Sequence, residues 1–164
     1  MSLNISKTNP VVSVPESYSE QINLNDTLRQ ALQQRLQYEK KNSDIIIRCD
    51  NLPVVETDRK KIVGVFDDIV QMIVSHPPNG TRLFLYVNCA EENTGMTGFD
   101  LVKRNKRYKV NFHTNISTDE AWKKAHEKTI AGCKAVLAQY GAGFTVKDIK
   151  STGCLFSISL LGKM

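Results

Sequence analysis

The most concentrated chemistry in the sequence is a short run of positive charge. Five basic side chains and no acidic one lie within seven residues, at Lys103, Arg104, Lys106, Arg107 and Lys109. The other 17 basic residues equal the 17 acidic residues in number, so this segment accounts for the net charge of +5. It is a candidate binding patch for phosphate, lipid headgroups or an acidic partner. The more ordinary interpretation is a solvated hairpin turn.

The other residues that commonly do chemistry are scattered. The histidines form no HxH or HExxH motif, and the four cysteines form no CxxC pair: Cys49, Cys89, Cys133 and Cys154. We therefore expect no metal site and no redox motif, and we expect all four thiols to be buried and reduced. Tyr108 is the aromatic residue beside the basic segment. Because one ring does not form a stacking platform, we do not expect nucleic-acid binding.

Length and composition limit the class of protein. The 164 residues, 41% hydrophobic and 24% charged, fit a soluble globular chain with one core. No apolar run approaches the roughly 20 residues that cross a bilayer, and the first residues lack the order of a secretory signal. We expect a cytoplasmic protein that does not insert into membranes.

Two helices are predicted in the N-terminal half. The first covers residues 24–40, with Asn25 or Asp26 as its cap. The second covers residues 59–76 and follows Asp58, whose side chain can cap it. Its buried face is predicted from i, i+3, i+4 and i+7 spacing: Ile62, Val65, Phe66, Ile69, Val70 and Ile73.

A third, long helix is predicted after residue 117. Residues 117–120 have the form of a capping box, in which Ser117 and Glu120 satisfy each other's backbone donors. Gly141 suits a left-handed position just beyond the end of the helix. The apolar stripe of this helix contains Trp122, His126, Ile130, Cys133, Val136, Leu137 and Tyr140.

The remaining segments predict strands and an arm. Residues 1–23 form the arm, in which Val11–Val14 can add an edge strand, and residues 24–164 form the domain. The strands are expected at residues 45–47 (buried), 54–55, 83–89, 99–102, 108–112, 144–146 and 155–160, with the basic segment as a turn. This order predicts an α+β two-layer sandwich, with three main helices on one face of a mixed β-sheet.

Two stretches of the chain resemble the ATP-binding domain of sensor histidine kinases, a GHKL-type ATPase. Leu52–Asp58 and the helix after it are similar to the strand, capping Asp and N-box helix of that family. Cys133–Gly141, Phe144–Val146 and Thr152–Leu160 are similar to its last helix, glycine turn and terminal hairpin. The resemblance spans about residues 22–162 and implies the same fold, with a role in two-component or related signalling.

The N-box departs from the family pattern. In the family, this helix carries two asparagines four residues apart, and the second holds the Mg²⁺ that bridges the ATP phosphates. Counted from Asp58, the matching positions are Asp68 and Met72. A thioether is a poor ligand for Mg²⁺, which prefers hard oxygen donors. Asp68 can still coordinate a metal, but an acid at a helix edge is more often a solvated surface group.

Both glycine turns of the family are also missing. The strand that matches the adenine-recognising turn, residues 108–117, contains Asn115 but no glycine. The phosphate-cradling turn falls at residues 127–130, which include Thr129, within a predicted continuous helix. Backbone N–H groups inside a helix are already bonded to carbonyls and cannot reach a phosphate. That helix also leaves no room for the family's mobile lid.

The resemblance and its departures together imply a degenerate, non-catalytic signalling or interaction module that uses no cofactor. A protein partner is expected, and a homodimer is left open. One alternative is an active histidine kinase or ATPase that binds ATP and Mg²⁺ through an atypical site such as Asp68. Another is an anionic partner bound through residues 103–109. His126 and Glu127 resemble a phosphoacceptor pair, but His126 lies on the apolar stripe and is expected to pack.

Overall fold

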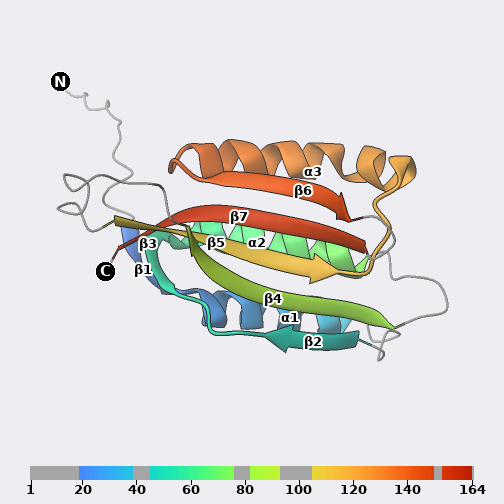
Figure 1. Cartoon of the computed structure of the whole chain (residues 1–164), viewed down its shortest axis with the longest axis horizontal. Helices are drawn as coiled ribbons and strands as arrows, with labels where there is room; N and C mark the ends of the chain where they lie inside the picture. Colours follow the sequence, from blue (N-terminus) through green and yellow to red (C-terminus); the bar gives the residue numbers. More distant parts are fainter. Residues whose placement is uncertain (1–18, 39–44, 76–81, 93–104, 150–152, 164) are drawn as a thin grey trace, which may run out of the picture.

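The computed structural model describes residues 19–38, 45–75, 82–92, 105–149 and 153–163 (Figure 1). In chain order its elements are β1 (Ser19–Asn23), α1 (Leu24–Tyr38), β2 (Ile45–Cys49), β3 (Val54–Asp58), α2 (Arg59–Val74), β4 (Leu83–Glu92), β5 (Asn105–Thr114), α3 (Glu120–Ala138), β6 (Gly143–Ile149) and β7 (Gly153–Lys163). The predicted strands at residues 11–14 and 99–102 fall outside the described residues.

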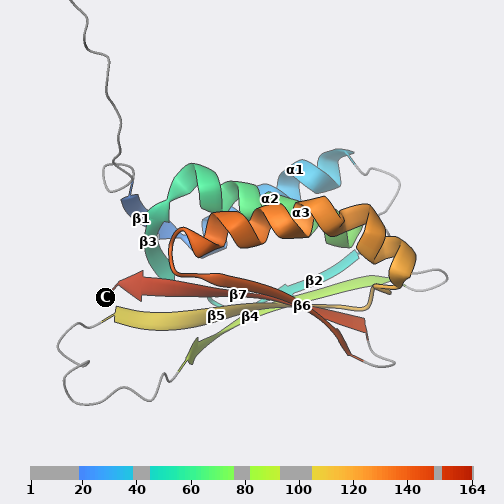
Figure 2. The same cartoon turned by 90° about the horizontal axis from the view of Figure 1, so that it is seen from above.

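The strands form one large sheet and one small one. The large sheet has the order β2-β4-β5-β7-β6, in which β2 runs parallel to β4 and the other pairs are antiparallel. β1 and β3 pair separately, so the last five residues of the predicted arm form a strand. Figure 2 shows α1, α2 and α3 together on one side of the large sheet. The predicted α+β sandwich with three helices on a mixed sheet is confirmed.

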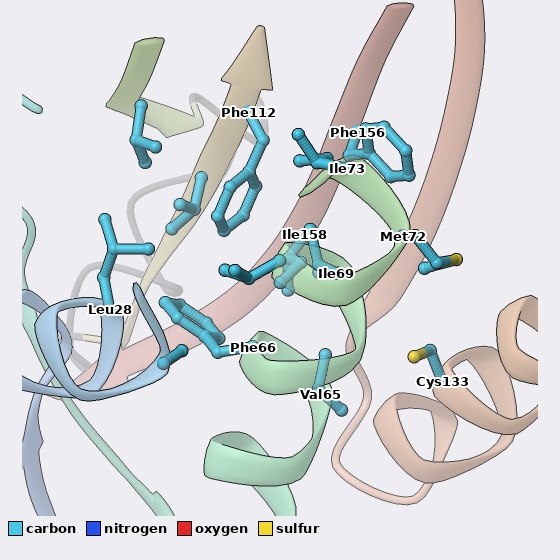
Figure 3. Close-up of a cluster of buried hydrophobic side chains, with 14 of the residues drawn as sticks. Leu28, Val65, Phe66, Ile69, Met72, Ile73, Phe112, Cys133, Phe156 and Ile158 are labelled. Atoms are coloured by element: carbon cyan, nitrogen blue, oxygen red, sulfur yellow. The ribbon is translucent and has the colours of Figure 1, made fainter. Parts of the chain in front are cut away.

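The core lies between α2 and the sheet. All six residues predicted on the buried face of α2 are buried, which confirms the helical period read from the sequence. Phe66 meets Phe112 of β5 edge to face, with ring centroids 5.6 Å apart. Figure 3 shows Ile69 and Ile73 of α2 in the same buried cluster as Phe156 and Ile158 of β7. None of the helices in the described ranges is long and apolar enough to cross a membrane.

The start of α1 differs from the prediction. Asn23 Oδ1 accepts a hydrogen bond from the backbone N of Asn25 at 2.9 Å, so Asn23 is the cap and neither Asn25 nor Asp26 is. The Asn25 side chain instead bonds both backbone groups of Leu52, at 3.0 and 3.2 Å. Asp26 pairs with Arg29 on the surface. Leu52, 27 residues further along the chain, therefore binds the side chain that the local sequence predicted as the cap.

The ends of α2 and α3 are partly as predicted. Asp58 caps α2 by accepting from Lys61 N at 3.3 Å, as expected. The predicted capping box of α3 is wrong, because Asp119 is its N-cap and accepts from Trp122 N at 2.9 Å. Asp119 competes for the same helix start, and its ionised carboxylate also favours the positive end of the helix dipole. Gly141 has a φ of 67° after the last turn of α3, which confirms the predicted left-handed position.

Two strand predictions need correction. Residues 45–47 do form part of a strand, but Ile46 and Ile47 are 44% and 36% exposed rather than buried. The reason is that β2 lies at the edge of the large sheet, with β4 on one side. The basic segment was predicted as a turn before a strand at residues 108–112, yet β5 already begins at Asn105.

Candidate functional site

Met72, which the resemblance matches to the second N-box asparagine, is fully buried. It lies on α2 and faces α3, whose Trp122 and Cys133 are 4% and 2% exposed. Met72 and Cys133 point toward each other between the two helices (Figure 3). The indole N–H of Trp122 also donates to the Met72 carbonyl at 3.4 Å. Apolar side chains therefore fill the volume beside this position.

Asp68 lies one turn before Met72 and is half-buried. The Cys133 thiol donates to its Oδ2 at 3.8 Å. Burial raises the pKa of Asp68, and the charge of Asp67 raises it further, while the thiol and Arg35 act in the opposite direction. Arg35 itself is held by Asp67 through two hydrogen bonds, at 2.7 and 3.1 Å. The surroundings therefore stabilise the ionised carboxylate of Asp68 less than water does.

The thiols differ from the prediction in exposure. Burial raises the pKa of Cys133 to about 12, with the charge and hydrogen bond of Asp68 adding to the effect, and raises that of Cys154 to about 11. Both are buried as expected and are poor nucleophiles at neutral pH. Cys49 is exposed on the edge strand β2, and Cys89 is only half-buried near the end of β4, so the prediction is wrong for these two.

Asn115 has a backbone partner on each side of its amide. Its Oδ1 accepts from Phe84 N at 2.8 Å, and its Nδ2 donates to the Arg82 carbonyl at 2.8 Å. In this way the side chain continues the pairing of β5 with β4 beyond Thr114. The side-chain hydrogen bonds of Asn115 thus link the end of β5 to the start of β4, and they do not involve Asp68 or Met72.

Thr129 lies in the middle of α3, which is continuous from Glu120 to Ala138. No glycine turn interrupts the helix there. Within the predicted apolar stripe, Trp122, Cys133 and Leu137 are buried, while His126 is half-buried against the Trp122 ring at 4.7 Å. The buried face of α3 is thus narrower than the sequence indicated.

The described part of the basic segment has two different roles. Arg107 donates to the Gly141 carbonyl and to Ser159 Oγ, both at 3.2 Å, so it ties β5 to β7 and to the end of α3. Lys109 is exposed on the sheet. Lys103 and Arg104, and the side chain of Lys106, fall outside the described residues. The predicted turn is therefore wrong for residues 105–107, which belong to β5.

A ladder of hydrogen-bonded polar side chains on the sheet face away from the helices was not predicted from the sequence. Asn111 Nδ2 donates to Asn88 Oδ1 at 3.1 Å, Ser157 Oγ donates to Asn111 Oδ1 at 2.8 Å, and Asn88 Nδ2 lies 3.4 Å from His113 Nε2. His113 also stacks on Tyr86, with centroids 5.6 Å apart. Alternate polar residues in three strands were the available signal, but sequence does not show which strands are neighbours.

Solved structures with the same fold are catalytic domains of histidine kinases. The nucleotide-free catalytic domain of ThkA has a TM-score of 0.59 at 18% identity, covering 88% of this chain and 96% of that one. The mycobacterial sensor histidine kinase MprB has a TM-score of 0.60 at 13% identity, with coverages of 88% and 98%. For the cytoplasmic segment of QseC the values are 0.56, 11%, 88% and 78%. The predicted histidine-kinase ATPase fold is thereby confirmed.

One further structure shows ThkA in complex with the response regulator protein TrrA. At the level of sequence, no protein-family model and no curated protein matches the chain. The likeness to the solved structures is therefore one of fold, since their identity to this chain lies below one fifth.

Proposed function

We propose that this domain keeps the fold of a histidine-kinase ATPase domain without binding nucleotide, and acts as a non-catalytic interaction module in signal transduction. A fold and the site grafted on it are separable, so a scaffold can persist after its chemistry is lost. Under this proposal Asp68, Met72, Asn115 and Thr129 are degenerate nucleotide-site positions.

The burial of Met72 is the single observation that carries the proposal. The position that holds Mg²⁺ in the family has a thioether here, fully covered, with Trp122 and Cys133 beside it. Magnesium needs several oxygen ligands in near-octahedral geometry and keeps water molecules around it. To admit the ion and a triphosphate, α3 would have to leave α2 and expose its apolar face.

An atypical active site built on Asp68 is the second candidate, and it fits less well. Asp68 is the carboxylate nearest to Met72 along α2, but it accepts a hydrogen bond from the Cys133 thiol, and burial raises its pKa. An active site built on Asp68 would therefore need a movement of α3 that releases this hydrogen bond and uncovers Met72.

A protein is the partner that this proposal implies. ThkA, which has the same fold, is seen in complex with a response regulator. A response regulator, or another protein of a signalling pathway, is therefore the first class to test for this domain. A second copy of the chain is the other class to test.

Nucleotide titration tests the loss of ATP binding. A ligand that binds only the native state stabilises it by about 2.7 kcal/mol at a hundred times its Kd. Calorimetry and thermal melting with ATP and Mg²⁺ should therefore show no binding heat and no shift at millimolar nucleotide. A magnesium-dependent shift that disappears in Asp68→Asn would overturn the proposal in favour of the atypical active site.

A further inference from the structure

The sheet face away from the helices carries one row of side chains drawn from all five strands. Cα partners in neighbouring strands place these residues in order across the sheet: Arg48, Tyr86, His113, Leu155 and Lys147. At about 4.8 Å between strands, the row spans about 19 Å. It has a cation at each end and two rings side by side near its middle.

The rings form a preorganised stack. Tyr86 and His113 lie 24° from parallel, and the Tyr86 hydroxyl donates to Asp50 Oδ2 at 2.6 Å, which fixes the tyrosine. Phe84 is two residues before Tyr86 on the same face of β4, about 6.6 Å along the strand, and is 38% exposed. Three aromatic rings therefore lie on the same face of two adjacent strands.

The charge of this face is positive. Arg48, Lys109 and Lys147 are exposed, and no carboxylate of the described residues lies within ion-pair distance of them. Two acids also belong to this face. Asp50 accepts from Tyr86, and Glu92 accepts from Ser159 at 2.6 Å. These hydrogen bonds leave the negative charges in place, so the three cations exceed the two acids of this face by one charge among the described residues.

A polar ladder adjoins the rings. Asn88, Asn111 and Ser157 follow one another across β4, β5 and β7, one row beyond Tyr86 and His113. Ser157 is buried, and its hydrogen bond helps to orient the half-buried amides of Asn88 and Asn111, which have further donor and acceptor capacity. Groups of this kind can pair with the edges of nucleobases.

We propose that this face binds single-stranded nucleic acid, with bases stacked on Phe84, Tyr86 and His113 and phosphates beside the cations. Aromatic side chains on an open sheet, flanked by basic residues, are an established means of binding single strands. An acidic protein would need only the cations, whereas the stacked rings and the amide ladder suit nucleobases.

No nucleic-acid binding was predicted from the sequence, because Tyr108 was the aromatic residue considered beside the basic segment. Tyr108 alternates with Lys109 and lies on the opposite face of β5 from the ladder. The fold assembles the platform from β2, β4, β5, β7 and β6 instead. This inference is independent of the proposed loss of nucleotide binding.

Fluorescence anisotropy of a labelled oligouridine of about twelve nucleotides, a length that covers typical site sizes, tests the proposal on the whole chain. Stacking is worth about 1–3 kcal/mol per base, so Tyr86→Ala combined with His113→Ala should weaken binding by tenfold or more. Tyr86→Phe keeps the ring and should bind nearly as well as the wild type. Melting temperatures of the variants check that each one folds.

The cations are tested by the dependence of affinity on salt. Arg48→Gln combined with Lys147→Gln should weaken binding and flatten its salt dependence, since each neutralised phosphate contact lowers the slope. Lys124→Gln combined with Lys128→Gln removes the same charge from the exposed side of α3 and serves as the matched control.

Three outcomes would overturn the inference. One is the absence of binding at high micromolar protein, and another is an equal loss in the α3 control variant. The third is unchanged affinity without the rings, together with equal competition by a glutamate-rich peptide, which would assign the face to acidic proteins.

Discussion

Ile69 and Asp68 are neighbours on α2 with opposite surroundings, and they allow a direct test of the helix face. Ile69 is fully buried, so Ile69→Ala should lower the free energy of unfolding by about 2–5 kcal/mol. Asp68→Ala removes a half-buried carboxylate of raised pKa and should cost less than about 1 kcal/mol. Urea unfolding measures both. A larger loss for Asp68→Ala would contradict the orientation of α2.

The buried thiol of Cys133 predicts a loss of stability in alkali. Its pKa is about 12 in the folded chain, above the ordinary value of 9.0, so the folded state binds a proton that the unfolded state releases. The stabilisation is complete below about pH 9 and is lost as the pH rises toward 12. Urea unfolding at several pH values should show a shallower decline for Cys133→Ala. Parallel declines would contradict the prediction.

Single residues were predictable from sequence where local pattern decides their role. The buried face of α2, the cap Asp58 and the left-handed Gly141 follow from periodicity and helix-end chemistry. The roles of Asn25 and Ser117 could not be predicted. Asn25 binds Leu52, which is distant in sequence, and the nearby Asp119 caps α3 in place of Ser117. Met72 was interpreted from the sequence as a replaced magnesium ligand, and its burial could not be predicted because it depends on where α3 packs.

At the scale of elements, Gly153 holds the start of β7 against β5. Its φ is 135°, and a Cβ built there would lie 2.0 Å from the Thr114 carbonyl oxygen. Gly153→Ala should therefore lower the free energy of unfolding by about 2 kcal/mol or more, through strain and displaced backbone. Chemical denaturation followed by circular dichroism measures the loss.

Gly64 in α2 is the matched control for that change. No atom outside its own helix lies within 4 Å of a Cβ placed there. Gly64→Ala should raise stability by about 0.5–1 kcal/mol, because alanine is the better helix former. A loss of stability in Gly64→Ala, or none in Gly153→Ala, would contradict the backbone conformations described for the two elements.

Elements were predicted best where one period dominates. α2 and α3 were recognised from their apolar spacing, and the strand order could not be read because pairing partners lie far apart in sequence. β5 was shortened in the prediction because its basic residues resemble a turn. The row of side chains on the sheet face away from the helices could not be predicted either, because Arg48, Tyr86 and His113 become neighbours only through strand pairing.

At the scale of the whole molecule, the net charge of +5 should govern long-range attraction to anionic partners. For the solvated patch predicted from the sequence, neutralising Lys103, Arg104 and Lys106 together should weaken such binding with little change in melting temperature. Arg107→Gln should lower the melting temperature, because Arg107 bonds Gly141 and Ser159. Thermal melts and binding titrations at two salt concentrations measure both effects. An unchanged melt for Arg107→Gln would contradict its structural role.

The two edges of the large sheet present different surfaces to other molecules in a concentrated solution. β6 carries Lys147 and Asp148 at its exposed edge, and charges of this kind hinder the addition of a foreign strand. Among the described residues, β2 instead offers Ile45–Ile47 along its free edge, with Ile45 half-buried and Ile46 and Ile47 44% and 36% exposed. The colloidal stability of the protein should therefore depend more on β2 than on its total charge. Ile46→Lys should therefore raise the highest concentration at which the protein remains monodisperse.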